Sequence, residues 1–161
     1  MDVVEGSFEE LPFEEERFDV VWSQDAFLHS GDRGAVVREI GRVLVKEGGK
    51  VVFTDPMAAE GVGKEKLGPI LERLKLESLG SLEFYRQEFE KRGFEEVGFE
   101  DLSGHLTVHY ARVLEELERM EEDLRGAISD EYVANMKEGL EHWIEGGRNG
   151  KLSWGISQFR R

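Results

Sequence analysis

The sequence predicts an α/β fold: part of a doubly wound sheet, about four strands with flanking helices. Residues 18–23 (FDVVWS) are a largely apolar run followed by polar, titratable side chains, and residues 50–54 (KVVFT) repeat this pattern before Asp55. One amphipathic helix separates the two runs, as in the strand–helix–strand unit of a parallel sheet. Because ligands of such sheets bind beyond the carboxyl ends of the strands, we expect the functional site there.

The first half of the chain supplies this unit. The first strand is expected over residues 17–23 and, because its apolar run is continuous, it is expected to be buried on both faces. A helix is expected over about residues 32–46, with an apolar stripe and a stop at Gly48 and Gly49. The second strand covers residues 50–54.

The second half adds helices and two further strands. Pro69 suits the first turn of a helix over residues 70–76, and Ser81 suits the N-cap of a helix that ends at Gly93. The remaining elements are a strand at 94–101, a helix at about 106–125, a helix from Ser129 to about 145, and a final strand marked by Leu152, Trp154 and Ile156. The chain is therefore expected to form one domain of about four strands and about five helices.

The first strand has the composition of a central strand, although little sequence precedes it. A central strand at the edge of a sheet exposes unpaired backbone groups and invites pairing with another chain. We therefore expect an exposed strand edge.

Composition narrows the function classes. The chain has 161 residues, a formal net charge of -14 and no cysteine. The charge argues against nucleic-acid and anionic-membrane partners, and the absence of cysteine excludes thiol chemistry. No apolar run approaches the ~20 residues of a membrane span, and no signal peptide is visible, so a cytoplasmic location is expected.

Three segments resemble a known family. Residues 6–13 (GSFEELPF), 18–23 (FDVVWS) and 42–49 (RVLVKEGG) resemble, in order and spacing, the second half of class I S-adenosylmethionine-dependent methyltransferases. Three further segments narrow the resemblance to the sarcosine/dimethylglycine N-methyltransferases of glycine betaine synthesis. They are residues 22–30 (WSQDAFLHS), 54–57 (TDPM) and 135–155 (NMKEGLEHWIEGGRNGKLSWG). The resemblance implies a partial Rossmann-like methyltransferase fold, S-adenosylmethionine as methyl donor and a small amine as substrate.

The family carries two further strand–helix units ahead of this point, with a glycine-rich turn and an acidic residue for the ribose. No glycine-rich turn follows a strand in this sequence. Residues 1–161 are therefore expected to be the C-terminal portion of a methyltransferase domain. The expected partner is the N-terminal half or, through the first strand, a second copy of this chain.

Catalytic and cofactor-binding candidates lie near the first strand. Asp25 and His29 are the catalytic candidates: Asp25 would hold the amine and His29 would accept a proton or orient the substrate. Equally, Asp25 could fix a helix N-terminus and His29 could cap or pack against a helix. From the resemblance, the cofactor-binding candidates are Gly6, Ser7, Phe8, Ser23 and Gln24.

Substrate-binding candidates are aromatic or cationic, because a methylated amine favours aromatic rings and its carboxylate favours a guanidinium. They are Trp22, Tyr110, Trp143 and Arg148, with Lys151 and Arg86 as further cations and Phe27, Tyr85 and Trp154 as further rings. For each ring a core position is the alternative. No metal site is expected, since His105 and His109 lack a third ligand nearby.

Three functions remain open. The first is N-methylation of sarcosine or dimethylglycine, incomplete in this chain alone. The second is a non-catalytic half-domain that dimerises through its first strand. The third is methylation of another small acceptor by the same fold.

Overall fold

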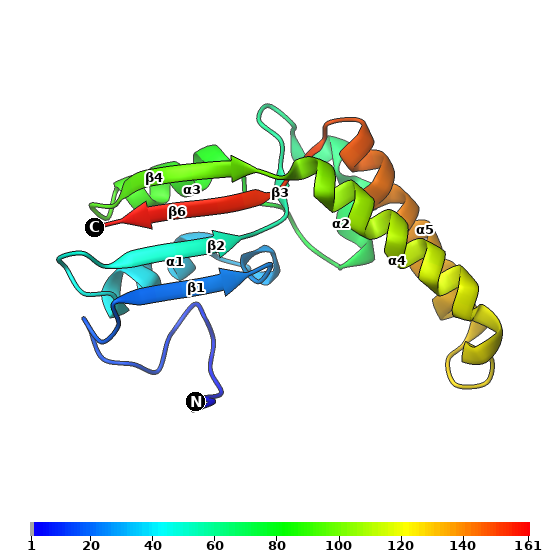
Figure 1. Ribbon diagram of the computed structural model, residues 1–161, viewed down its shortest axis with the longest axis horizontal. Coiled ribbons are helices and arrows are strands. Elements are labelled where there is room, and N and C mark those ends of the chain that lie inside the picture. Colours follow the sequence, from blue (N-terminus) through cyan, green and yellow to red (C-terminus); the bar gives the residue numbers. More distant parts are fainter. Residues whose placement is uncertain (1) are drawn as a thin grey trace.

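The computed structural model describes residues 2–161 and contains a four-stranded mixed sheet (Figure 1). The strand order is β1-β2-β6-β4, in which β1 (Val20–Gln24) pairs in parallel with β2 (Lys50–Thr54). Strand β6 (Gly155–Arg160) lies between β2 and β4 (Glu95–Asp101) and is antiparallel to both. The predicted α/β class, the parallel first unit and the edge position of the first strand are confirmed.

Helices α1 (Arg33–Val43) and α3 (Leu82–Glu90) lie against one face of this sheet (Figure 1). Each begins at a side-chain cap: Asp32 accepts a hydrogen bond from the Ala35 amide, and Ser81 accepts one from the Phe84 amide. These caps satisfy amides that have no partner within the helix.

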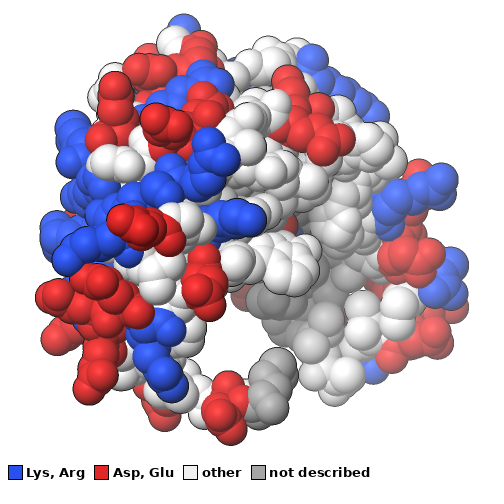
Figure 2. All heavy atoms as spheres, turned by 60° about the vertical axis from the view of Figure 1, so that its left-hand side comes forward, with Lys and Arg blue, Asp and Glu red and all other residues white. Residues whose placement is uncertain are grey.

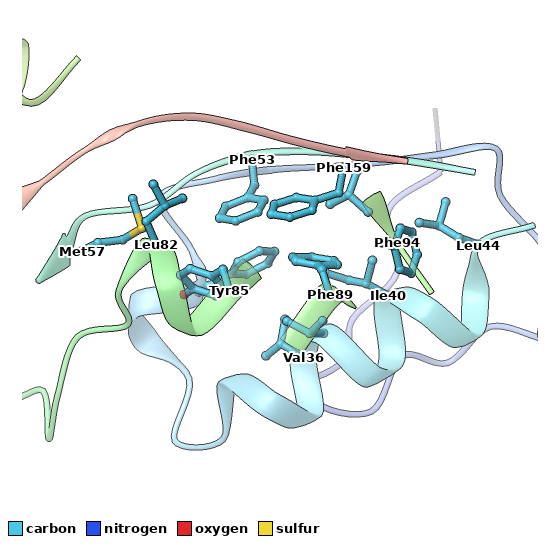
Figure 3. Packing of buried hydrophobic residues seen from close by; sticks show 13 residues of the cluster. Val36, Ile40, Leu44, Phe53, Met57, Leu82, Tyr85, Phe89, Phe94 and Phe159 are labelled. Carbon is cyan, nitrogen blue, oxygen red and sulfur yellow. The ribbon is translucent and has the colours of Figure 1, made fainter. Parts of the chain in front are cut away.

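Aromatic rings fill the space between the helices and the sheet (Figure 3). Phe53 and Phe159 project from β2 and β6, and Phe89 of α3 stacks on Phe159 with ring centroids 4.4 Å apart. Tyr85 meets Phe53 edge-on at 5.0 Å. The core of the sheet therefore lies on one side only.

The prediction that the first strand is buried on both faces is wrong. Val20 and Trp22 are 53% and 75% exposed, whereas Val21 packs against the core. The cause is the layer arrangement: α1 and α3 cover the face that carries Val51 and Phe53, and nothing among residues 2–161 covers the face of Val20 and Trp22. The strand thus has one open edge and one open face.

A second group of elements builds a helical arm beside the sheet. Helices α4 (Ser103–Leu124) and α5 (Asp130–Arg148) pair as a hairpin that extends away from the sheet (Figure 1), and the short helix α2 (Gly68–Arg73) packs on α5. Their apolar cluster centres on Trp143, which has no exposed surface. The predicted helices are confirmed to within a few residues at their ends.

The final predicted strand is divided. Residues Leu152–Ser153 form β5, which pairs with β3 (Met57–Ala58) in a separate two-stranded sheet, and β6 starts at Gly155. Trp154 lies between the two strands, so the expected alternation of Leu152, Trp154 and Ile156 along one strand is wrong. The core side of β6 carries Ser157 and Phe159 instead.

Two short 3-10 helices complete the fold: η1 (Phe27–His29) and η2 (Lys64–Lys66). Phe27 packs into the cluster between sheet and helices, while Leu28 packs into the cluster around Trp143. Helix η1 is therefore anchored in both cores.

The surface carries both signs of charge. In the face shown in Figure 2, Lys and Arg side chains lie among Asp and Glu side chains. Among residues 2–161, no helix is long and apolar enough to cross a membrane.

Candidate functional site

The carboxyl ends of β1 and β2 meet at Asp25. This residue follows β1 directly and has a backbone φ of 48°, a left-handed conformation that is uncommon outside glycine. Its amide donates to the Thr54 carbonyl at 2.9 Å. Its carboxylate oxygen Oδ1 accepts two hydrogen bonds of 2.8 Å, from the Thr54 hydroxyl and from the indole Nε1 of Trp154. We call Asp25, Thr54 and Trp154 the Asp25 clamp.

His29 is exposed and lies on η1, four residues beyond Asp25. The backbone of its neighbour Leu28 is held on both sides. The Leu28 amide donates to Asp55 Oδ1 at 2.9 Å, and Arg33 Nη2 donates to the Leu28 carbonyl at 2.8 Å. The position of His29 is therefore set by the buried Asp55 carboxyl and the buried Arg33 guanidinium, which hold the backbone of Leu28, rather than by the His29 side chain.

Asp55 is the most perturbed carboxyl group of the site. It has no exposed surface, and Tyr85 donates its hydroxyl hydrogen to Asp55 Oδ2 at 2.8 Å. Burial raises the pKa of Asp55 to about 7, against smaller lowering effects of the Tyr85 and Leu28 hydrogen bonds. A buried carboxyl is harder to ionise because the charged form loses its hydration. Burial likewise raises the pKa of Tyr85 well above its ordinary value.

The segment of Gly6, Ser7 and Phe8 lies beside η1. Its neighbour Glu9 accepts hydrogen bonds at Oε1 from the Ser30 hydroxyl (2.6 Å) and the Gly31 amide (2.9 Å). The Ser30 hydrogen bond is the main reason that the pKa of Glu9 is lowered. Ser7 closes a turn in which its hydroxyl accepts from the Glu9 amide, and Phe8 packs on the sheet core. The segment of Gly6, Ser7 and Phe8 is thus brought to the loop that follows His29.

Three predicted residues lie on β1 itself. Trp22 and Gln24 are exposed on the open face of the strand, whereas Ser23 is half-buried and pairs in register with Phe53. Trp22 and Gln24 point to the same side because side chains two apart in a strand share a face. Ligand access to this face is unobstructed by residues 2–161.

Tyr110 of α4 lies beside the Arg73 side chain. The Arg73 guanidinium lies 5.3 Å from the centre of the Tyr110 ring. Burial raises the pKa of Tyr110, Arg73 lowers it, and the Asp25 carboxylate adds a smaller upward contribution. Tyr110 is therefore within electrostatic range of both Arg73 and Asp25.

Trp143 supports Tyr110 from behind. The two ring centroids are 4.9 Å apart, and Trp143 Nε1 donates to the Ile70 carbonyl at 2.9 Å. Because Trp143 has no exposed surface, direct contact with a substrate would require its neighbours to move. In this structure the ring is a core residue that places Tyr110.

The remaining cations are dispersed. Arg148 is exposed at the end of α5, Lys151 is half-buried beyond it, and Arg86 forms an ion pair with Glu96 at 2.8 Å. The described residues contain no group of three or more His, Asp or Glu side chains that could hold a metal ion. His105 and His109 are both exposed on α4.

Sequence reasoning missed four residues of this site: Glu9, Arg33, Asp55 and Arg73. Asp55 carried a usable signal, since an acid directly after a buried strand stands where ligands of such sheets bind. Glu9 belongs to an acidic stretch and Arg73 to a short helix, where charges ordinarily face water. The hydrogen bonds of Arg33 to Leu28 and Ser78 depend on a fold that no spacing revealed.

Two cavities of about 550 Å³ each accompany the site. One lies between the loop of residues 58–63 and the segment 78–84, with Arg33 on its wall, and the other lies between α2 and α5 beside Arg73. Neither cavity is lined by Asp25 or His29.

Comparison with known proteins identifies relatives along nearly the whole chain. Residues 1–53 match the methyltransferase domain family. The glycine/sarcosine/dimethylglycine N-methyltransferase of Actinopolyspora halophila is 55% identical over 99% of this chain and 28% of its own length. The sarcosine/dimethylglycine N-methyltransferase of Halorhodospira halochloris is 49% identical over 100% of this chain and 57% of its own length.

Solved structures agree with these relatives. A crystal structure from Galdieria sulphuraria, assigned as a sarcosine dimethylglycine methyltransferase, superposes with a TM-score of 0.89 at 45% identity, over 96% of this chain and 57% of that chain. Phosphoethanolamine N-methyltransferase 2 of Haemonchus contortus shares the fold with a TM-score of 0.82 at 21% identity. The predicted partial methyltransferase fold is confirmed, and this chain spans between 28% and 57% of the relatives named above.

Proposed function

We propose that this chain is the C-terminal part of a class I S-adenosylmethionine-dependent N-methyltransferase that acts on sarcosine or dimethylglycine. The similarity at 49% and 55% identity along the chain supports the family and the reaction. The observation that carries the substrate class is the pair of opposite charges that act on Tyr110: the Arg73 guanidinium, 5.3 Å from the centre of its ring, and the Asp25 carboxylate, which helps to raise its pKa. An N-methylated amino acid is a zwitterion and matches such a pair of opposite charges.

The residues present fit part of a cofactor site. When bound, S-adenosylmethionine supplies an electrophilic methyl group. Gly6, Ser7 and Phe8 would contact its adenine, and Ser23 and Gln24 would contact its amino-acid end. In support, the contacts of Glu9 with Ser30 and Gly31 bring the first of these segments to η1, which lies directly beyond β1. Gln24 is exposed, so its amide can reach a ligand.

Asp25 is proposed to hold the substrate amine. Its Oδ1 is occupied by two donors, whereas Oδ2 accepts no hydrogen bond from any described residue. A carboxylate oxygen next to an ammonium forms a charge-assisted hydrogen bond, which is stronger than a neutral one. Arg73 would hold the substrate carboxylate, because a guanidinium can engage both oxygens. Arg148 and Lys151 are the alternative cations for this position.

His29 is proposed to take up the amine proton. Methyl transfer needs a neutral amine, because only the free lone pair attacks the methyl carbon. His29 is exposed, and an imidazole nitrogen can accept a proton. Trp22, Tyr110 and Trp143 would add aromatic surface for the methylated nitrogen, Trp143 through its support of Tyr110.

Methylation of sarcosine and dimethylglycine is expected when this chain is mixed with the N-terminal part of the Halorhodospira halochloris relative, and little methylation is expected from this chain alone. The Asp25→Asn variant should reduce the rate about 100-fold, because it removes the charge that binds and orients the amine. The rate of labelled product formation from labelled S-adenosylmethionine measures methylation by the chain alone, by the mixture and by the variant.

The matched control is Glu118→Gln, a similar loss of charge on the exposed side of α4. Glycine and phosphoethanolamine, tested side by side, separate the proposed substrates from other acceptors. If the mixture binds S-adenosylmethionine but methylates none of the four acceptors, the proposed reaction is wrong.

The open edge of β1 favours a second candidate function, a non-catalytic module that pairs through this strand. Val20 and Trp22 expose apolar surface beside an edge without a partner among residues 2–161. Such an edge is a template for strand addition.

For this candidate we expect a dimer in sedimentation at micromolar concentration, and a monomer after Val20→Lys, since a charge on an edge strand opposes pairing. Val108→Lys on α4 is the control, because Val108 is similarly exposed (59% against 53%) but far from the sheet edge in sequence. A stable monomer of the unaltered chain would count against pairing with itself.

A further inference from the structure

We infer that Trp154 and Thr54 are positioning residues that select for a charged amine by fixing Asp25, and that Trp154 ties this selection to the start of α4. The inference rests on the proposed function, in which Asp25 holds the substrate amine. The sequence predicts Trp154 only as a further aromatic ring for the substrate, whereas the role inferred here belongs to its indole N–H and follows from hydrogen bonds between segments far apart in the chain.

The first step is the backbone of Asp25. A residue with a side chain at a φ of 48° costs about 1 kcal/mol relative to an ordinary conformation, so its surroundings must hold it there. The Asp25 amide donates to the Thr54 carbonyl, which fixes the backbone to the end of β2. The carboxylate then leaves β1 in a direction that a regular strand would not give it.

The second step is the carboxylate itself. Thr54 Oγ1 and Trp154 Nε1 both donate to Oδ1, so two neutral donors saturate one oxygen and leave Oδ2 for a ligand. These donors come from β2 and from the residue between β5 and β6. Because neither donor carries a charge, the Asp25 carboxylate keeps its negative charge unneutralised for the amine.

The third step is the anchoring of Trp154. Its amide donates to the Ser103 hydroxyl at 3.0 Å, and its carbonyl accepts from the Leu102 amide at 2.9 Å. Ser103 is the first residue of α4, the helix that carries Tyr110. Trp154 therefore joins the two sides of the proposed amine site, Asp25 on one and the Tyr110 helix on the other.

The test compares two ligands of nearly equal shape. Dimethylglycine carries the amine, whereas 3-methylbutanoate replaces its nitrogen by carbon and keeps the carboxylate. Calorimetric titration of the chain, mixed with the N-terminal part of the Halorhodospira halochloris relative, gives the ratio of the two dissociation constants. We expect Trp154→Phe and Thr54→Val to lower the preference for dimethylglycine about threefold to tenfold. Asp25→Asn should lower this preference at least tenfold. Thr54→Ser keeps the hydroxyl and should restore the preference.

A merely structural role would weaken both ligands equally and leave the ratio unchanged. Val133→Ala, which removes buried surface from α5 away from the clamp, controls for general destabilisation and should keep the ratio. The indole N–H resonance of Trp154, which should shift in Asp25→Asn, reports the hydrogen bond independently of binding.

The outcomes distinguish a failure of the positioning role from a failure of the proposed amine site. A lowered ratio in Asp25→Asn together with an unchanged ratio in Trp154→Phe and Thr54→Val would overturn the positioning role and leave the proposed function standing. An unchanged ratio in Asp25→Asn, or binding of neither ligand to the unaltered mixture, would overturn the proposed amine site and this inference with it.

Discussion

Trp143→Ala is expected to lower the free energy of unfolding by about 3–5 kcal/mol. Trp143 has no exposed surface and contributes the largest side chain to the cluster formed by α2, α4 and α5. Truncation removes its buried surface and leaves a cavity between helices that the surrounding side chains fill only partly. It also removes the indole N–H that donates to the Ile70 carbonyl.

Equilibrium denaturation measures this loss, with Tyr132→Ala as the control. Tyr132 is an aromatic residue of the same helix, but it is 54% exposed, so its removal should change stability by no more than about 0.5 kcal/mol. Trp143→Phe should fall between the two, because it keeps one aromatic ring but loses the second ring of the indole and the N–H. A loss below about 1 kcal/mol in Trp143→Ala would contradict the packing of α5 described here.

The protein is expected to lose stability as pH rises from about 5 to about 8 because of Asp55. Its pKa in the folded protein is about 7, against an ordinary value of 3.8, so the folded state holds a proton that the unfolded state has released. Stability then falls with rising pH until the folded pKa is passed, and becomes level above it. The free energy of unfolding should decrease by about 3 kcal/mol across this interval, since one pKa unit corresponds to about 1.4 kcal/mol.

Asp55→Asn should abolish this slope, because asparagine does not titrate. At about pH 5 the variant should be less stable than the parent, since its amide group replaces the oxygen that accepts from Tyr85. The disadvantage should shrink as pH rises. Asp101→Asn serves as the control: its pKa is lowered mainly by the Ser103 hydrogen bond, so it titrates below this interval and leaves the slope in place. A parent protein of constant stability over the interval would contradict the buried state of Asp55.

The order of elements followed from the sequence because local signals mark each one. Ser81 caps α3 and Ser129 caps α5, and each of these signals acts over a few residues. The predicted stop at Gly48 lies five residues beyond the end of α1 at Val43. The burial of β1 could not be read in the same way. An apolar run predicts burial, but which layers are present to provide it is a property of the whole fold. The split of residues 152–156 into two strands likewise depends on β3 and β2, the partners that Leu152 and Ile156 find.

The candidate site was predictable where it coincides with a strand end and unpredictable where it depends on contacts across the fold. Asp25 follows β1 and could be placed from position alone. Its donor Trp154 lies 129 residues away, and no spacing connects the two. Arg73 and Tyr110 meet because α2 and α4 both pack on α5, and no spacing in the sequence indicates that contact.

The strand order determines when the sheet can be completed during synthesis. Strand β6 lies between β2 and β4, although the whole α4–α5 hairpin is translated between β4 and β6. Until residues 155–160 are synthesised, the two halves of the sheet have no strand to join them, and Phe53 and Phe89 lack the ring of Phe159. Contacts between such distant segments slow folding and leave apolar surface open on the nascent chain. Synthesis of this protein should therefore proceed with an unclosed core until β6 has left the ribosome.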